Sequence, residues 1–387
     1  MTGIETLFWL SLSVIVYSYP GYPTLLWFLS RFSIRARSQR AETGEENLPS
    51  VTLIISAYNE EKVIGEKINN ALSLEYPKDL LEIVVVSDGS DDRTTEIASQ
   101  FAAMGIRLLH YEKRTGKTAC LNKAVPLATR KIIVFSDANS SYDKHALKAL
   151  VRPFQDSTVG FVTGWTRYGS GGDPITANPI SFYAKLELVT KELESIVGSC
   201  VGADGAIFAI RKELFIPLEE YDINDFVIPM SIIRQGYRGV LERKAFCFEN
   251  TAGGTKREFH RQVRIASRTI RAIMNYRNLL NPLRFGFFSI QLLSHKLSRL
   301  LVPLFMVLLL VSNLPLASTG GFYLMVLTGQ VLLYGGASAT NLVPRTGVLS
   351  RLADAAQTFV VINMAIVLAW AKYLRGETYT TWSPTQR

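Results

Sequence analysis

Two long stretches without a charged side chain limit the folds open to this chain more than any other feature. Residues 6–30 and 300–344 contain no Asp, Glu, Lys or Arg. Because one helical crossing of a bilayer needs about 20 apolar residues, the first stretch predicts one crossing. The second predicts two, separated by the turn-like sequence SNLPLASTGG. Residues 355–371 are a weaker fourth candidate, and a multi-pass membrane protein is expected.

Basic residues set the expected orientation of these crossings. The segment after the first stretch is basic, with Arg31, Arg35, Arg37 and Arg40. Since cytoplasmic flanks are rich in Arg and Lys, the N-terminus is expected outside and the middle of the chain in the cytoplasm. The expected location is the plasma (inner) membrane. No positive charge precedes the apolar run and no small-residue cleavage site follows it, so a signal peptide is not predicted.

The charge and apolar patterns together predict six segments. The net charge of +9 suits an anionic lipid bilayer or a phosphate-bearing ligand. Nucleic acid is not expected, because the arginines cluster beside a membrane span. The expected segments are an N-terminal membrane helix (1–30), a basic linker (31–48), a soluble α/β domain (49–280), an interfacial amphipathic helix (281–299), two membrane helices (300–344), and an amphipathic segment with a further crossing and a polar tail (345–387).

Strand and helix patterns alternate through the start of the soluble domain. The runs VTLIIS, LEIVVVSDGS, IRLLHY and KIIVFSDAN are typical of buried strands, and sequences with helical spacing separate them. This alternation predicts a mostly parallel sheet with helices on both faces. Ligands of such sheets bind at the carboxyl ends of the strands.

Polar side chains stand where these predicted strands end. Each one alone is explained by an ordinary turn or loop. Together they predict a cleft for an anionic, hydrogen-bonding ligand and a metal ion, and a lysine at a helix start suits a phosphate. The residues are Tyr58, Glu60, Asp88, Lys117, Asp137 and Asn139.

The motifs AYNEE, VVVSDGSDD, GKTACLN, FSDAN and INDF, in this order, resemble glycosyltransferase family 2. The resemblance covers residues 51 to about 268 and implies the nucleotide-sugar-binding fold called GT-A, a Rossmann-like α/β domain. The flanking apolar stretches resemble the membrane-embedded branch, which includes cellulose, hyaluronan and poly-N-acetylglucosamine synthases. This implies a GT-A domain between transmembrane helices.

The resemblance implies roles for the residues at the strand ends. Tyr58 and Glu60 would line the uridine pocket, and Asp88 would hydrogen-bond the uracil or the ribose. Lys117 would lie near the diphosphate of the donor.

The sequence DAN takes the place of the metal-binding DxD motif of the family. Asp137 would hold Mg²⁺ or Mn²⁺ on the diphosphate. Asn139 stands in the second position, where Asp is usual. The carboxamide still offers an oxygen, which hard cations accept.

The resemblance also implies an acceptor side. Asp225 matches the catalytic Asp of the family's ED motif, with Asn224 in place of the first acid. A helix N-cap is the alternative role for Asp225. Asp204 and Trp165 are candidate acceptor contacts, although Trp165 is equally well explained as a core aromatic.

A basic helix is predicted over residues 256–277. Its arginines recur at three- and four-residue steps and form one face, which could bind anionic lipid headgroups. Its sequence RQVRI resembles the QxxRW motif of processive synthases, which implies product or acceptor contacts for Arg261 and Arg264. Ile265 replaces the Trp that stacks on the acceptor sugar. His260 and His295 have no partner at metal-ligand spacing and are assigned no metal.

The sequence therefore predicts a membrane-bound, metal-dependent inverting glycosyltransferase. It would move a sugar from a nucleotide-diphosphate sugar, in particular a UDP-sugar, to a hydroxyl of a growing polysaccharide or glycan. Two alternatives stay open. One is a single addition onto a polyprenyl-phosphate or another lipid acceptor, and the other is an inert membrane scaffold with a degenerate nucleotide site.

Overall fold

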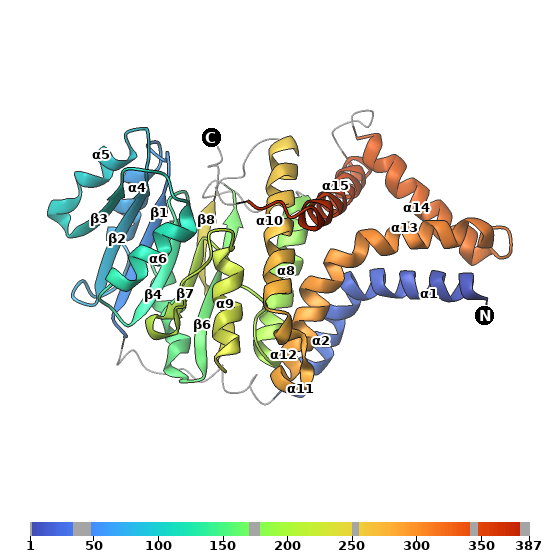
Figure 1. Ribbon diagram of the computed structural model, residues 1–387, viewed down its shortest axis with the longest axis horizontal. Helices are drawn as coiled ribbons and strands as arrows, with labels where there is room; N and C mark the ends of the chain where they lie inside the picture. The colour runs from blue at the N-terminus through green and yellow to red at the C-terminus, as the bar shows by residue number, and fades with distance from the viewer. Residues whose placement is uncertain (1, 34–47, 170–178, 250–254, 341–346, 380–387) are drawn as a thin grey trace.

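The computed structural model describes residues 2–33, 48–169, 179–249, 255–340 and 347–379. Arg35, Arg37 and Arg40 of the basic linker lie outside these residues. The described strands are β1 (Val51–Ala57), β2 (Leu81–Asp88), β3 (Ile106–Tyr111), β4 (Ile132–Asp137), β5 (Ser141–Tyr142), β6 (Val159–Tyr168), β7 (Ile207–Arg211) and β8 (Arg238–Glu249). They form one sheet in the order β3-β2-β1-β4-β7-β6-β8-β5, with a group of long helices beside it (Figure 1).

The two halves of this sheet differ in strand direction. The pairs β1–β2, β1–β4 and β2–β3 are parallel, as the alternation of strand and helix predicts. In the second half, β7 is antiparallel to both β4 and β6, and β5 is antiparallel to β8. Only β6 and β8 pair in parallel there. The sheet is therefore mixed, and the prediction of a mostly parallel sheet is confirmed only where the alternation is regular.

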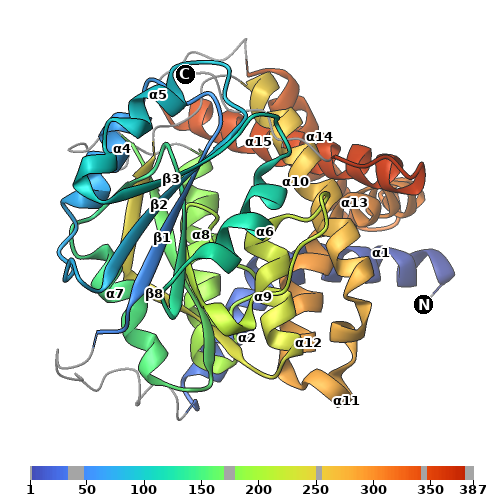
Figure 2. The same cartoon turned by 60° about the vertical axis from the view of Figure 1, so that its left-hand side comes forward.

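Helices cover both faces of the sheet (Figure 2). One face packs against α4 (Ile64–Leu72), α5 (Thr94–Ser99) and α7 (Ala146–Val151). The other packs against α6 (Lys117–Leu127), α9 (Asn224–Arg234) and α10 (Thr255–Asn275). Short 3-10 turns complete the domain at η2 (Ala102–Met104), η3 (Arg152–Gln155), η4 (Lys212–Leu214) and η5 (Arg277–Leu280).

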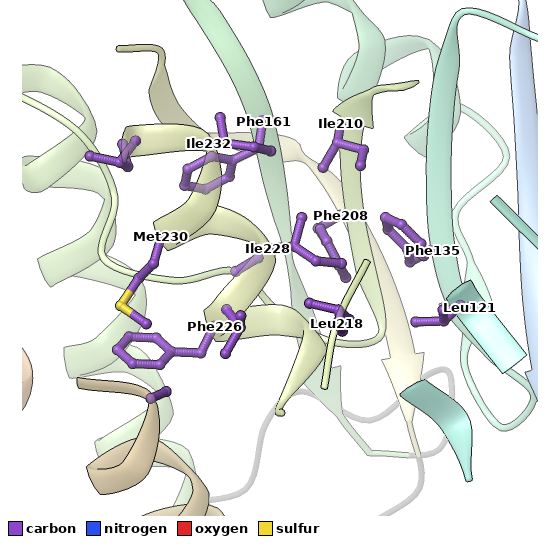
Figure 3. Close-up of a cluster of buried hydrophobic side chains, with 14 of the residues drawn as sticks. Leu121, Phe135, Phe161, Phe208, Ile210, Leu218, Phe226, Ile228, Met230 and Ile232 are labelled. Carbon is purple, nitrogen blue, oxygen red and sulfur yellow. The ribbon is translucent and has the colours of Figure 1, made fainter. Parts of the chain in front are cut away.

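An aromatic core holds α9 against the sheet (Figure 3). Phe135 of β4 and Phe208 of β7 are stacked, with ring centroids 4.6 Å apart. Ile228 and Ile232 of α9 pack onto this layer beside Phe161. Each fully buried side chain of this size contributes about 1.5–3 kcal/mol to folding. The position of α9 is therefore fixed by packing along most of its length.

The remaining helices lie beyond the β8 side of the sheet (Figure 1), and all but the charged α8 (Pro179–Val197) are largely apolar. They are α1 (Gly3–Val16), a π-helical turn η1 (Tyr17–Gly21), α2 (Tyr22–Ser30), α8 (Pro179–Val197), which joins them to the sheet, α11 (Pro282–Phe285), α12 (Phe287–Leu292), a second π-helical turn η6 (Leu293–Leu297), α13 (Ser298–Leu316), α14 (Gly321–Ser338) and α15 (Val348–Leu374). Within the described part of the chain, two helices are long and apolar enough to cross a membrane, Phe287–Leu316 and Val348–Leu374. The predicted crossings at 6–30 and in the second half of 300–344 are not confirmed by this criterion.

A buried group of charged side chains joins these helices to α8, which packs beside the sheet. Nδ1 of His295 lies 2.8 Å from Oε1 of Glu194, and Nε2 lies 2.8 Å from Oε2 of Glu187. Both carboxylates come from α8. Both ring nitrogens of His295 therefore lie within hydrogen-bond distance of carboxylates on one helix. His295, to which sequence spacing assigned no partner, thus has two partners more than 100 residues away in the sequence.

Other groups complete what we call the His295 cluster. The Tyr22 hydroxyl donates to Glu194 (2.8 Å), and Lys296 and Arg299 donate to Glu187 (3.0 and 2.8 Å). The two π-helical turns meet here as well, since the Tyr17 hydroxyl lies 2.7 Å from Oγ of Ser294. The cluster therefore ties the N-terminal helices and α13 to the same helix, α8.

Candidate active site

An open cleft lies at the carboxyl ends of β1, β2 and β4. Its empty space, part of which is open solvent, is about 280 Å³, and it also meets the first turn of α6. This is where the topology of a parallel sheet predicts a ligand site. The lining residues are Ser56, Ala57, Tyr58, Val86, Asp88, Lys117, Cys120 and Asp137.

The loop after β1 forms one wall of the cleft. The Arg114 guanidinium lies 3.9 Å from the ring centroid of Tyr58, and the Tyr58 hydroxyl lies 3.4 Å from Asp91. Glu60 is two residues further on, and its backbone N–H donates to Oγ1 of Thr94 (2.8 Å). Tyr58 faces the cleft, whereas Glu60 is not among its lining residues. The predicted contact of Tyr58 with a base stays open to test.

Asp88 is committed to the loop that starts α6. Its Oδ1 accepts from the Thr115 backbone N–H (2.7 Å), and its Oδ2 accepts from that of Gly116 (2.8 Å). Gly89 follows with φ at +61°, and a Cβ there would come within 2.4 Å of the Arg114 backbone nitrogen. Asp88 thus positions the start of α6, a role that the resemblance does not supply.

Lys117 and Asp137 form an ion pair at the mouth of the cleft. Both side chains are partly exposed, 18% and 31% respectively, so a ligand can reach them. Asn139 lies two residues beyond, and its side chain forms no hydrogen bond with any described residue. Lys67 stabilises the turn that follows β4, because its Nζ donates a hydrogen bond to the Ser140 carbonyl (2.6 Å). Burial lowers the pKa of Lys67 to about 8.

These donors fit a divalent cation only together with a phosphate ligand. Among the residues that the structure describes, no three His, Cys, Asp or Glu side chains are grouped so that they could hold a metal. Asp137 and Asn139 offer one carboxylate and one carboxamide at a strand end. Mg²⁺ is often held by one or two carboxylates and the phosphates of a substrate. The pair therefore fits a cation that is bound with the diphosphate of a donor.

Asp225 is a half-buried residue whose carboxylate has one buried oxygen without a hydrogen bond to a described residue. It is the second residue of α9, and Ile223 occupies the N-cap, so the alternative role of Asp225 as an N-cap is wrong. Its Oδ1 is buried and accepts no hydrogen bond from any described residue. Burial raises the pKa of Asp225, while Lys117 and Lys191 lower it. Such a group can accept a proton from a substrate.

Asp204 and Trp165 have structural partners. Asp204 accepts hydrogen bonds from the backbone N–H groups of Thr166 (2.9 Å) and Ala206 (3.1 Å), and burial raises its pKa. The half-buried indole of Trp165 donates to the Arg243 carbonyl (2.9 Å). Both residues therefore shape this side of the site, and their contact with an acceptor stays a prediction.

The arginines of α10 differ in their partners. Arg261 pairs with Glu258 (3.0 Å), and Arg268 donates twice to the carbonyl of Tyr379, which follows α15. Arg264 has no hydrogen bond or ion pair with a described residue, and burial lowers its pKa to about 10. Its neighbours Arg268 and Arg261 contribute to that shift. A half-buried guanidinium without a carboxylate partner among the described residues favours binding of an anion.

Comparison with known proteins agrees with this geometry. Residues 52–217 match the family model described as glycosyl transferase family 2. These residues are a glycosyltransferase family 2 domain. The chain is 23% identical over 255 residues to the poly-beta-1,6-N-acetyl-D-glucosamine synthase of Staphylococcus aureus (strain COL), and 23% identical over 252 residues to that of Staphylococcus epidermidis (strain ATCC 35984). Each match spans 61% of this chain and 61% of the relative.

A solved structure extends the likeness to almost the whole fold. A mannosyltransferase from Pyrobaculum calidifontis, in complex with GDP-Man and Mn²⁺, superposes with a TM-score of 0.68 and 22% identity. The match covers 95% of this chain and 99% of that one. The family 2 domain thus has the predicted GT-A, Rossmann-like fold.

Sequence reasoning missed two lysines beside the site of this family 2 domain. Lys67 lies between Ile64 and Ile68 on the apolar face of α4, and a lysine in that place signals a buried charge. Lys191 lies on α8 with Glu187 and Glu194 at four- and three-residue steps. The sequence KLELVTKELES places these three charged residues on one face of the helix, and this spacing could have indicated their interaction.

Proposed function

We propose that this chain is a membrane-bound inverting glycosyltransferase. It would transfer a sugar from a nucleotide-diphosphate sugar, in particular a UDP-sugar, to a hydroxyl of a growing polysaccharide or glycan. The observation that carries the proposal is the carboxylate of Asp225, which has a buried oxygen without a described hydrogen-bond partner and interacts electrostatically with Lys117 and Asp137. We place the catalytic domain on the cytoplasmic side of the plasma membrane, with the apolar helices in the bilayer.

The residues of the site divide the reaction between them. Asp225 takes the proton of the acceptor hydroxyl while its oxygen attacks the anomeric carbon. The bond from that carbon to the diphosphate breaks on the opposite face, so an α-linked donor gives a β-linked product. Lys117, in the first turn of α6, stabilises the negative charge that grows on the diphosphate. Asp137 and Asn139 would hold Mg²⁺ or Mn²⁺, which supplies further charge stabilisation there.

The names of the similar proteins support a sugar donor with a nucleotide and a metal. The curated relatives are named as synthases of an N-acetylglucosamine polymer, and the solved mannosyltransferase is in complex with GDP-Man and Mn²⁺. UDP-N-acetylglucosamine is therefore the first donor to test. Ile265, in the place of an acceptor-stacking Trp, favours the second candidate, a single addition onto a polyprenyl-phosphate or another lipid.

A donor panel tests the proposal. The full chain, purified in detergent, is given UDP-N-acetylglucosamine, UDP-glucose or GDP-mannose with Mg²⁺ or Mn²⁺, and released nucleotide is measured. We expect release from a UDP-sugar and none in EDTA. Release from GDP-mannose alone would contradict the UDP preference. Binding of all donors without any release, in membranes that supply acceptors, would favour the inert scaffold.

The arginines of α10 give a separate prediction. We expect Arg264→Ala to lower kcat/KM about 10-fold or more, since a hydrogen bond to a charged group contributes roughly 1.5–3 kcal/mol. Arg268→Ala and Arg271→Ala should be milder, because these side chains donate to carbonyls of Tyr379 and Glu377. The measurement is kcat/KM in neutral and in anionic liposomes. Equal losses for all three variants, seen only in anionic liposomes, would instead identify a headgroup-binding face.

A further inference from the structure

A short series of hydrogen bonds connects α8 to the proposed catalytic carboxylate. Nζ of Lys191 donates to the carbonyl of Ala203 (3.1 Å). The backbone N–H of Ala203 donates in turn to the carbonyl of Asp225 (2.7 Å). The next residues of this loop touch the carboxylate itself, because a Cβ at Gly205 would lie 2.9 Å from Oδ2 of Asp225. Lys191 therefore braces the loop against which Asp225 rests.

The surroundings of Lys191 keep its ammonium charged. Burial disfavours the charge, but the carboxylates of Glu187, Asp204 and Asp225 outweigh it and raise the pKa of Lys191. Among the described residues, the Ala203 carbonyl is the one hydrogen-bond acceptor of the Lys191 ammonium. The charge thus acts mainly through space on the acidic groups around it.

The His295 cluster fixes the helix that carries Lys191. Glu187 precedes Lys191 by four residues and Glu194 follows it by three, so all three lie on one side of α8. His295 bridges the two carboxylates at 2.8 Å on each side. Rotation or sliding of α8 would break both contacts. The position of Lys191 is therefore set by the apolar helices.

We propose that Lys191 is a positioning residue for sugar transfer, which holds the loop at Ala203 against Asp225 and places a positive charge among the acidic groups of the site. The proposal rests on the function proposed above, in which Asp225 accepts the proton of the acceptor. Neither the resemblance nor the sequence motifs assign a role to Lys191. It acts through Asp225 and not on the donor.

The charged groups around Asp225 give the sign of the expected pH effect. Burial raises the pKa of Asp225, Lys117 and Lys191 lower it, and Asp204 and Asp137 raise it. Arg268 of α10 also faces Asp225. Removal of the Lys191 charge raises the pKa of Asp225 further. Because the base must be ionised, the acid limb of the pH–kcat/KM profile should move to higher pH.

Three variants of the full chain in detergent test the proposal, with UDP-N-acetylglucosamine as the probe. Lys191→Met should lower kcat about 10- to 100-fold, since a misplacement of about 1 Å costs up to about 10²-fold. Lys191→Arg should restore the acid limb and part of kcat. Lys185→Met, which removes an exposed charge from the same helix, should leave both unchanged. The melting temperature and UDP affinity of each variant show that it is folded.

A second measurement does not depend on turnover. Carbodiimide reacts with protonated carboxyls, so its labelling of Asp225, read by mass spectrometry across pH, follows the protonation of that residue. We expect labelling of the Lys191→Met protein to persist to higher pH than in the wild type. An unchanged labelling curve overturns the proposal whether or not the probe is a substrate.

The outcomes separate this proposal from the proposed function. If Lys191→Met raises only the KM for acceptor and leaves kcat and the acid limb unchanged, Lys191 binds the acceptor and the positioning role is wrong. If the acid limb stays in place while Asp225→Asn is inactive, Lys191 is unimportant and the catalytic role of Asp225 stands. If Asp225→Asn is active, the proposed function itself fails.

Discussion

Asp225→Asn should lower the rate of sugar transfer by about 10²- to 10⁴-fold, the usual contribution of a general base. The carboxamide has nearly the shape of the carboxylate but cannot take a proton from the acceptor. Asp225 is not a lining residue of the cleft at the strand ends, so nucleotide binding should be almost unchanged. Transfer rate and UDP affinity are measured on the same preparation.

Asp222→Asn is the matched control for that substitution. Asp222 lies three residues earlier and is buried, and burial also raises its pKa. Its Oδ2 accepts from the Glu219 backbone N–H (2.9 Å), a bond that an Asn oxygen keeps. We expect this variant to retain most of its activity. Near-normal turnover of Asp225→Asn, or an equal loss in both variants, would remove Asp225 from its proposed role.

The second large effect is expected at Asp137. Asp137→Ala should be nearly inactive at any concentration of Mg²⁺ or Mn²⁺, because Asp137 is the one carboxylate of the proposed metal pair. The same change leaves Lys117 without its ion-pair partner. EDTA should abolish wild-type activity. Full activity of the wild type in EDTA would contradict the metal site.

Asn139 provides the graded comparison. Asn139→Ala should be milder than Asp137→Ala, since it removes only a neutral oxygen. Asn139→Asp adds a negative charge beside the cation and should lower the metal concentration needed for half-maximal rate, because hard cations bind more tightly as ligand charge rises. A metal titration of the wild type and the three variants measures this. A higher metal requirement for Asn139→Asp would argue against coordination at this turn.

The cleft at the strand ends was predictable because it depends on local patterns. The four apolar runs became β1 to β4, and the parallel order of these strands brings their carboxyl ends to one edge. Tyr58, Asp88, Lys117 and Asp137 accordingly line one cleft. Both carboxylate oxygens of Asp88 accept hydrogen bonds from the turn before α6. The sequence could not show this, because an Asp-Gly pair at a strand end is compatible with a ligand contact and with a structural turn.

The second half of the sheet and the apolar helices were less predictable because their contacts are long-range. The partners of His295 are 101 and 108 residues away in the sequence, and no spacing rule connects them. Antiparallel β7 enters the sheet between β4 and β6, which no alternation of strand and helix predicts. Apolar composition alone also gave four crossings, where two helices meet the criterion within the described residues.

The His295 cluster has a practical consequence for anyone who wishes to study the catalytic part as a water-soluble protein. A shortened chain that begins at residue 48 and ends at 280 would lose Tyr22, His295, Lys296 and Arg299 but keep Glu187 and Glu194. That cut would remove the partners of both carboxylates in the cluster and expose the face of α8 that the deleted helices cover. The protein is therefore best handled as one folded unit, in which the apolar helices are part of the structure that positions α8 and not a removable anchor.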